Sequence, residues 1–109
     1  MDKELKDRVA IVTAAGRGIG KGIAVKLSQE GADVVITDLN FESAKSIIEE
    51  IKKNNGRGLA IKADVSEPDD VKRMVEATIK RFGKIDILVN NVGINKPAPI
   101  WEVTEKIGT

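Results

Sequence analysis

Four glycines stand at every second position near the start of the chain, directly after a short apolar run rich in β-branched residues. The apolar run is Val9–Thr13, and the glycines are Gly16, Gly18, Gly20 and Gly22. A turn without Cβ atoms can be tight, and the backbone amides at the start of the following helix then point at a bound anion. This stretch therefore predicts a strand, a glycine turn and a helix N-terminus that hold a phosphate group.

The spacing of these glycines does not match two familiar phosphate-binding patterns. A Walker A motif would need a glycine in place of Ala15, and Ser or Thr in place of Gly22 to hold magnesium. A literal G-x-G-x-x-G fails as well, because counting from Gly18 puts its last glycine at Ile23. The remaining alternative is a glycine-rich turn that binds nothing. We consider it the weaker interpretation, because four glycines cost helix stability and need a compensating reason.

An aspartate follows the second apolar run of the chain. The run is Asp33–Thr37, and Asp38 lies eighteen residues after Gly20. A carboxylate about 20 residues beyond a dinucleotide-binding turn can accept hydrogen bonds from the adenosine ribose. It would also repel a 2′-phosphate, so Asp38 favours NAD over NADP, although Arg17 could pair with such a phosphate. The alternative is a solvated turn or helix-capping residue.

Two further polar pairs follow the third and fourth apolar runs. Asp64 and Val65 come after the third run, where a carboxylate could bond an adenine amino group; an ordinary turn aspartate is an equal alternative. Asn90 and Asn91 come after the fourth run, just before Gly93, and their amides could bond both the neighbouring backbone and a ligand. The alternative there is a common asparagine–glycine turn.

Composition narrows the chemistry that the chain can perform. The 109 residues carry a net charge of +1, which argues against a dedicated nucleic-acid or membrane-surface binder. Cysteine, histidine and tyrosine are absent, which excludes thiol chemistry, a Cys-based metal site and two of the commonest proton-transfer side chains. The charged start, Met1–Arg8, and the lack of a long apolar run indicate no signal peptide and no membrane span. We expect a cytoplasmic location.

The residues that bear chemistry lie between regularly alternating strand and helix patterns. The predicted strands are Val9–Thr13, Asp33–Thr37, Gly58–Ala63 and Ile85–Asn90. The predicted helices are Gly18–Glu30, Phe41–Asn54 and a third from about Ser66 to Phe82. Short connections between them predict an α/β fold, a Rossmann-type doubly wound parallel sheet of order 3-2-1-4. The first two helices would cover one face and the third the other, in a single domain over residues 1–109.

Local signals place the ends and faces of these helices. Asn40 is predicted to cap the second helix, and Ser66 is predicted to begin a capping box at the third. In the first helix, Ile19, Ala24 and Leu27 are predicted to share an apolar face with Ile23. These signals orient each helix against the sheet.

The whole chain resembles the N-terminal half of a short-chain dehydrogenase/reductase. Thr13, Gly18 and Gly20 match the family pattern T-G-x-x-x-G-x-G, with Ala14 in place of its first glycine. Asp38 matches the family's NAD-selecting acid, Asp64 and Val65 its adenine-contact pair, and residues 90–93 its N-N-A-G, with Val92 in place of the alanine. The segment Ile85–Val89 is similar to the subgroup that contains 3-oxoacyl-carrier-protein reductases and glucose or sugar-alcohol dehydrogenases.

The resemblance implies a cofactor site without its catalytic partner. It implies NAD, preferred over NADP, and these binding residues: Gly16, Arg17, Gly18, Ile19, Gly20, Asp38, Leu39, Asp64, Val65, Asn90, Asn91 and Gly93. Family members work with a Tyr-x-x-x-Lys pair, a serine and a later asparagine, and this chain has no tyrosine. We therefore assign no catalytic residue and no metal ligand, and we expect the chain alone to be inactive. A non-catalytic nucleotide-binding or interaction module is the alternative.

The same resemblance leaves two surfaces uncovered. In the family, another strand pairs with the free side of the fourth strand, Ile85–Asn90, and further helices pack beside the third helix. An apolar edge strand invites pairing with another chain, and an uncovered apolar face favours association. We expect self-association through one or both surfaces, and binding of neither nucleic acid nor membrane.

Overall fold

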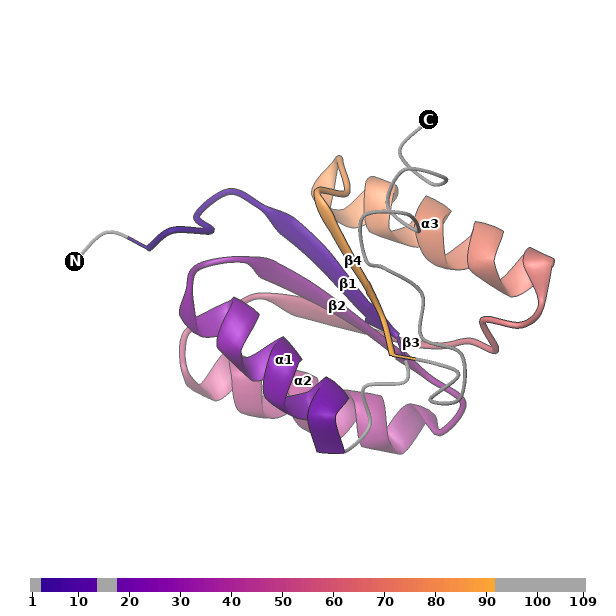
Figure 1. Cartoon of the computed structure of the whole chain (residues 1–109), viewed down its shortest axis with the longest axis horizontal. Coiled ribbons are helices and arrows are strands. Elements are labelled where there is room, and N and C mark those ends of the chain that lie inside the picture. The colour runs from indigo at the N-terminus through magenta and orange to yellow at the C-terminus, as the bar shows by residue number, and fades with distance from the viewer. Residues whose placement is uncertain (1–2, 14–17, 92–109) are drawn as a thin grey trace.

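Four parallel strands alternate with three helices in the computed structural model, which describes residues 3–13 and 18–91. In chain order the elements are β1 (Val9–Thr13), α1 (Gly18–Gln29), β2 (Asp33–Asp38), α2 (Phe41–Lys53), β3 (Gly58–Lys62), α3 (Pro68–Phe82) and β4 (Ile87–Asn90). The strands lie in the order β3-β2-β1-β4 (Figure 1). This confirms the predicted doubly wound sheet of order 3-2-1-4.

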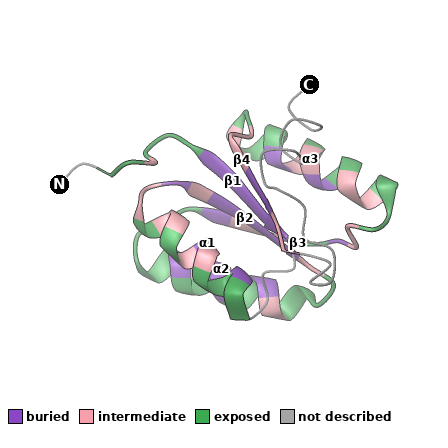
Figure 2. Cartoon of the chain, in the orientation of Figure 1, coloured by how far each residue is buried: buried purple, intermediate pink, exposed green. Residues whose placement is uncertain are grey.

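The central strands are buried on both faces, which explains their unbroken apolar sequences. All five residues of β1 are buried, as are the four central residues of β2 (Figure 2). The pairing is in register, with Val9 opposite Asp33 and Thr13 opposite both Thr37 and Asn90. Parallel strands need helical crossovers, and these cover the sheet on both sides.

Successive residues of the strands alternate between two cores. On one face, Val34 and Ile36 of β2 pack with Ala44 and Ile48 of α2, and α1 contributes to the same core. On the other face, Val35 packs with Met74 of α3. Figure 1 shows α1 and α2 together on one side of the sheet and α3 on the other. The predicted distribution of helices between the faces is therefore confirmed.

Two local predictions about the helices are wrong, and one is confirmed. Ile19 lies at the start of α1 with 76% of its surface exposed, so it does not join the apolar face that Ala24 buries. The N-cap residue of α3 is Glu67 rather than Ser66, because the Ser66 hydroxyl donates to Asp64 Oδ1 at 2.6 Å instead. Asn40 caps α2 as predicted, its side-chain oxygen accepting from the Ser43 N–H at 3.2 Å.

The fourth strand begins two residues later than predicted, at Ile87 rather than Ile85. The reason lies in Asp86, whose carboxylate Oδ2 accepts the Val9 N–H at 2.8 Å, where a strand would offer a backbone carbonyl. The same carboxylate pairs with Lys84 at 3.2 Å and with Arg8 at 3.5 Å. Asp86 therefore ties the entry of β4 to the entry of β1.

Candidate functional site

The predicted cofactor-binding residues meet at one edge of the sheet. Because every strand is parallel, the carboxyl ends of all four strands lie at this edge. Asp38 ends β2 opposite Lys62 of β3, and Asn90 ends β4 opposite Thr13 of β1. In an open α/β sheet this edge is where ligands bind. Gly16, Arg17 and Gly93, which were also predicted to bind the cofactor, lie outside the described residues.

The N-terminus of α1 opens at the same edge, directly after β1. Gly18 starts the helix with φ of +65°, a conformation that favours glycine, and Gly20 is buried within the first turn. The first turn of α1 contains no acidic residue. The positive end of its helix dipole therefore favours a phosphate at this position. The exposed side chain of Ile19 stands beside this position.

Thr13 joins the ends of β1 and β4, a role that its place in the sequence motif did not reveal. Its hydroxyl is 3.0 Å from Asn90 Oδ1 and 3.3 Å from the Val89 carbonyl, and it accepts the Asn91 N–H at 3.1 Å. Thr13 is only 2% exposed. A buried hydroxyl needs partners, so a threonine closing an apolar strand is the signal that could have identified it. Thr13 thereby holds the predicted pair Asn90–Asn91 at the edge.

Asp38 and Leu39 connect β2 to α2. Asp38 is half-buried, and its Oδ1 accepts the Asn40 N–H at 2.8 Å. This bond shapes the turn. The side chain that caps α2 is that of Asn40, so Asp38 is not the helix-capping residue. Leu39 is 65% exposed at the same edge, beside the carboxylate. A carboxylate next to an exposed apolar side chain suits a ribose followed by a flat base.

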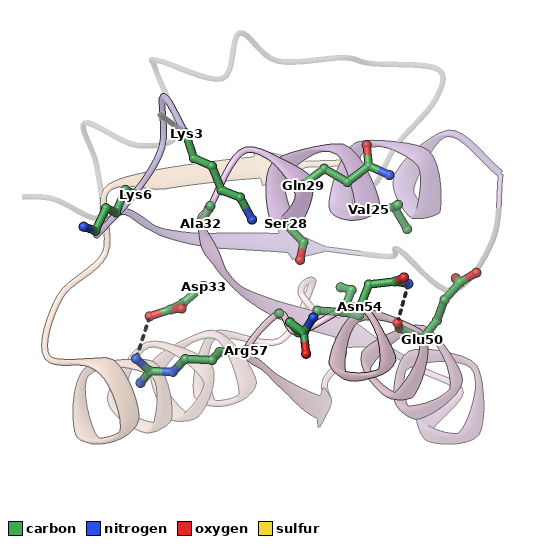
Figure 3. A pocket seen from close by; sticks show the side chains of 14 residues that line it. Lys3, Lys6, Val25, Ser28, Gln29, Ala32, Asp33, Glu50, Asn54 and Arg57 are labelled. Atoms are coloured by element: carbon green, nitrogen blue, oxygen red, sulfur yellow. Dashed lines mark hydrogen bonds and ion pairs between the residues drawn. The ribbon is translucent and has the colours of Figure 1, made fainter. Parts of the chain in front are cut away.

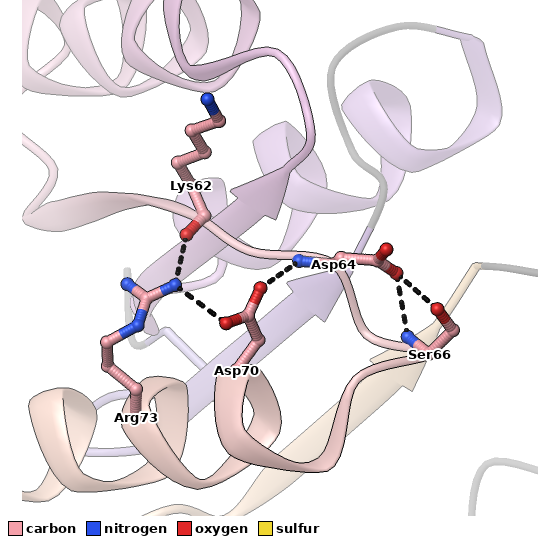
Figure 4. Close-up of polar contacts among 5 residues, drawn as sticks. All are labelled: Lys62, Asp64, Ser66, Asp70 and Arg73. Atoms are coloured by element: carbon pink, nitrogen blue, oxygen red, sulfur yellow. Dashed lines mark hydrogen bonds and ion pairs between the residues drawn. The ribbon is translucent and has the colours of Figure 1, made fainter.

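Asp64 and Val65 follow β3, and Asp64 is held by Ser66 and by Asp70 of α3 (Figure 4). The Asp64 N–H donates to Asp70 Oδ2 at 2.9 Å, and Asp64 Oδ1 accepts from both the N–H and the hydroxyl of Ser66. Arg73 donates to the Lys62 carbonyl at 2.8 Å and lies 3.3 Å from Asp70 Oδ1. The hydrogen bond from the Asp64 backbone, assisted by Arg73, lowers the pKa of Asp70 against the opposing effect of burial.

A cavity of about 420 Å³ lies at the opposite edge of the sheet (Figure 3). Its lining includes Lys3, Lys6, Ser28, Asn54 and Arg57, from the chain start and from the carboxyl ends of α1 and α2. Helix carboxyl ends present carbonyl oxygens, which disfavour phosphates. None of the predicted cofactor-binding residues that the structure describes lines this cavity, so it is separate from their edge of the sheet.

No three His, Cys, Asp or Glu side chains of residues 3–13 and 18–91 gather in a way that could hold a metal ion. Among the helices of the same residues, none has both the length and the apolar character needed to cross a bilayer.

Comparison with known families identifies the family to which the chain belongs. The sequence profile described as short chain dehydrogenase matches residues 8–107. The chain belongs to the short-chain dehydrogenase family. The glycine turn, Asp38, Asp64 and Asn90 all lie inside the matched range, and the resemblance inferred from them is confirmed.

Relatives within the short-chain dehydrogenase family match most of this chain. A hydroxynaphthalene reductase-like protein of Metarhizium majus (strain ARSEF 297) is 44% identical over 105 residues, covering 95% of this chain and 39% of that protein. A solved 7α-hydroxysteroid dehydrogenase, complexed with NADH and 7-oxo glycochenodeoxycholic acid, is 37% identical with a TM-score of 0.82, covering 90% of this chain and 38% of that one. A metagenomic short-chain oxidoreductase in complex with NADP is 37% identical with a TM-score of 0.78, covering 83% of this chain and 41% of that one. The chain thus spans about two fifths of the length of these family members.

Proposed function

We propose that this chain forms the nicotinamide-dinucleotide-binding portion of a short-chain dehydrogenase-type oxidoreductase. The observation that carries the proposal is that Asp38, Asp64 and Asn90, at or just after the carboxyl ends of three parallel strands, lie at the edge of the sheet where α1 begins. Two relatives of the same fold were solved with NADH and with NADP. When bound, such a cofactor would accept or donate a hydride.

The residues at the edge fit the adenosine half of the cofactor. The N-terminus of α1, with no acid in its first turn, would hold the pyrophosphate. The Asp38 carboxylate, at the end of β2, would accept hydrogen bonds from the ribose hydroxyls. Asp64 and Val65, at the end of β3, would contact the adenine. Each part of the ligand then faces a group of complementary chemistry.

The choice of NAD over NADP rests on the charge of Asp38. A carboxylate that bonds the ribose hydroxyls repels a phosphate on the 2′ oxygen. The two solved relatives carry different cofactors and give no preference. Asp38 therefore supports NAD as the preferred cofactor of this chain.

The reaction we propose for a complete family member is hydride transfer between the cofactor and an alcohol or ketone. This chain has no tyrosine to act as the general acid of that reaction. We therefore expect binding without turnover. The alternative is a non-catalytic nucleotide-binding or protein-interaction module that retains the fold alone.

Calorimetric titration of the chain with NAD, NADP and ADP-ribose tests the proposal. We expect NAD and ADP-ribose to bind, more weakly than to a full-length relative, and NAD to bind more tightly than NADP. The absence of NAD binding up to millimolar concentration would contradict the proposal and favour the interaction module.

Replacing the charge of Asp38 tests its role directly. Asp38→Ala should reduce the preference for NAD over NADP by about tenfold, the effect of about 1.4 kcal/mol of lost repulsion and hydrogen bonding. Glu42→Ala, an exposed acid in the first turn of α2, is the matched control and should leave the preference as it is. An unchanged ratio in Asp38→Ala would remove Asp38 from cofactor selection.

A further inference from the structure

Asp64 is held in one orientation by hydrogen bonds with Ser66 and Asp70. Its backbone N–H is bonded by Asp70 Oδ2 at 2.9 Å, across the turn between β3 and α3. Its side-chain Oδ1 accepts the Ser66 N–H at 2.9 Å and the Ser66 hydroxyl at 2.6 Å. With both its backbone and one carboxylate oxygen held, the direction of the other carboxylate oxygen is set.

These bonds leave two groups of neighbouring residues available to a ligand, the acceptor Asp64 Oδ2 and the donor Val65 N–H. Among the hydrogen bonds of the described residues, none uses Asp64 Oδ2 and none uses the Val65 N–H. The Watson–Crick edge of adenine presents an amino group beside an unprotonated ring nitrogen, a donor followed by an acceptor. Asp64 Oδ2 and the Val65 N–H offer the complementary order, an acceptor followed by a donor.

Arg73 fixes the position of Asp70 and of the strand end. Its Nη2 donates to the Lys62 carbonyl, the last residue of β3, at 2.8 Å and lies 3.3 Å from Asp70 Oδ1 (Figure 4). Asp70 and Arg73 lie three residues apart on α3, so one turn of the helix carries both. Met74, 1% exposed, anchors that turn in the core between α3 and the sheet.

We propose that Asp70 and Arg73, bonded to the Asp64 N–H and the Lys62 carbonyl, position Asp64 and Val65 to recognise adenine. We call these two side chains the α3 brace. The inference rests on the proposed binding of a dinucleotide and adds the residues that make the site specific for its base. Asp70 and Arg73 are positioning residues, because they act through Asp64 and touch no ligand themselves.

The competing explanation is that Asp70 merely stabilises the N-terminus of α3. Acidic side chains in a first turn do so through the helix dipole. Asp69 provides the matched control, because it lies in the same first turn, is exposed, and makes no hydrogen bond to the segment after β3. Asp69→Ala and Asp70→Ala remove the same charge from the same helix end, and only the second removes the brace.

The experiment compares two dinucleotides that differ only in the base. Nicotinamide hypoxanthine dinucleotide has a carbonyl in place of the adenine amino group and an N–H in place of the ring acceptor. Its carbonyl therefore places an acceptor against Asp64 Oδ2, and its ring N–H places a donor against the Val65 N–H, so neither hydrogen bond can form. Affinities of the 109-residue chain for NAD and for this analogue are measured by calorimetry in the wild type, Asp70→Ala, Asp70→Asn, Arg73→Ala and Asp69→Ala.

We expect the wild type and Asp69→Ala to prefer NAD by about tenfold or more, the effect of one or two hydrogen bonds. Asp70→Ala should lower that preference at least about threefold, and Arg73→Ala by a smaller factor. Asp70→Asn should retain part of it, because its amide oxygen can still accept the Asp64 N–H. A purely structural role would weaken both ligands equally and leave the ratio unchanged.

A measurement without ligand keeps the proposal testable if binding is weak. Amide hydrogen exchange at Asp64 should accelerate at least about tenfold in Asp70→Ala relative to Asp69→Ala, while the amides of β2 keep their protection. An unchanged NAD-to-analogue ratio in folded Asp70→Ala, or an unchanged exchange rate at Asp64, would overturn the brace alone. Failure of the wild type to bind either dinucleotide would overturn the proposed function as well.

Discussion

Two threonines at the same level of the sheet have opposite hydrogen-bonding states. Thr13 of β1 and Thr37 of β2 are paired in register and both are buried. The Thr13 hydroxyl bonds the β4 end and the Asn91 N–H. The Thr37 hydroxyl has no hydrogen-bond partner in the described part of the chain. A buried hydroxyl without a partner lowers stability, whereas a bonded one is costly to remove.

Replacing each threonine by valine should therefore affect stability differently at the two positions. Thr13→Val removes the acceptor of the partly buried Asn91 N–H and should lower the free energy of unfolding by about 1–3 kcal/mol. Thr37→Val removes an unsatisfied group and should leave that free energy unchanged or raise it by about 1 kcal/mol. Urea denaturation measures both. Thr13→Ser, which retains the hydroxyl, is the control, and equal stability of Thr13→Val and Thr13→Ser would contradict the assignment.

Asp86 should make stability depend on pH in the acid range. Its partial burial raises the pKa of its carboxyl, but the Val9 N–H, Lys84 and Arg8 together outweigh burial and lower it below the usual value. A lowered folded-state pKa contributes stability that is fully present above the unfolded value of about 3.9 and is lost as pH falls through the folded-state pKa.

The test compares Asp86→Asn with the wild type at neutral pH and below about pH 4. At neutral pH the variant should unfold at a lower urea concentration than the wild type. Its free energy of unfolding should be lower by about 1–2 kcal/mol, because the charged acceptor is lost. It should lose less stability than the wild type on acidification. Asp69→Asn, an exposed acid with no such partners, serves as the charge control. Parallel acid profiles for the wild type and Asp86→Asn would exclude Asp86 as a source of the dependence.

At the scale of elements, Gly22 of α1 and Gly58 of β3 have different structural roles. A Cβ at Gly22 in α1 would meet no described atom within 4 Å. A Cβ at Gly58, the first residue of β3, would lie 2.8 Å from the Val34 carbonyl oxygen and 2.6 Å from Ile48 Cδ1. Gly58 thus allows α2 and β2 to approach β3, while Gly22 has no steric need to be glycine within the described residues.

Alanine at these two positions should separate the roles. Gly22→Ala should raise the free energy of unfolding by about 0.5–1 kcal/mol, because it lowers the entropy that α1 loses on folding. Gly58→Ala should lower it by about 1–3 kcal/mol, because the Val34 carbonyl belongs to the backbone and cannot move freely. Thermal unfolding followed by circular dichroism measures both. Destabilisation by Gly22→Ala would show that α1 has a close neighbour at this position.

At the scale of the whole molecule, β4 forms the edge of the four-stranded sheet. Among the described residues, its only neighbour in the sheet is β1. Its apolar residues Leu88 and Val89 are buried, and on the adjacent helix Ile79 of α3 is 44% exposed. An edge strand with unpaired backbone groups is a template for another chain. We propose that the chain associates with itself through the edge of β4 or the exposed face of α3.

Light scattering at tens of micromolar concentration tests this proposal. We expect a molar mass above that of one chain, and we expect Ile79→Lys to reduce it if the α3 face is involved. An unchanged assembly in Ile79→Lys would assign the contact to the edge of β4. A monodisperse monomer in the wild type would rule out self-association.

The sequence by itself determined the order of the elements, the order of the strands and the face on which each helix packs. These features depend on periodicity and on the handedness of short crossovers, which are local or general properties of the chain. It also predicted that Asp38, Asp64 and Asn90 each follow a strand of a parallel sheet, and residues in such positions lie at one edge of the sheet. The burial of Ile19, in contrast, was wrongly predicted, since Ile19 lies at the very start of α1 and does not share the face that Ala24 buries.

Only the tertiary structure decided which partners the polar groups choose. Ser66 bonds Asp64 rather than capping α3, and Thr13 reaches Asn91 across a distance of 78 residues in the sequence. The α3 brace likewise joins a helix turn to the end of a strand. Such bonds depend on the relative placement of elements to within about an ångström, because hydrogen bonds weaken steeply with distance and angle. Residue types and spacing locate the candidate site, and packing sets the direction in which each of its groups points.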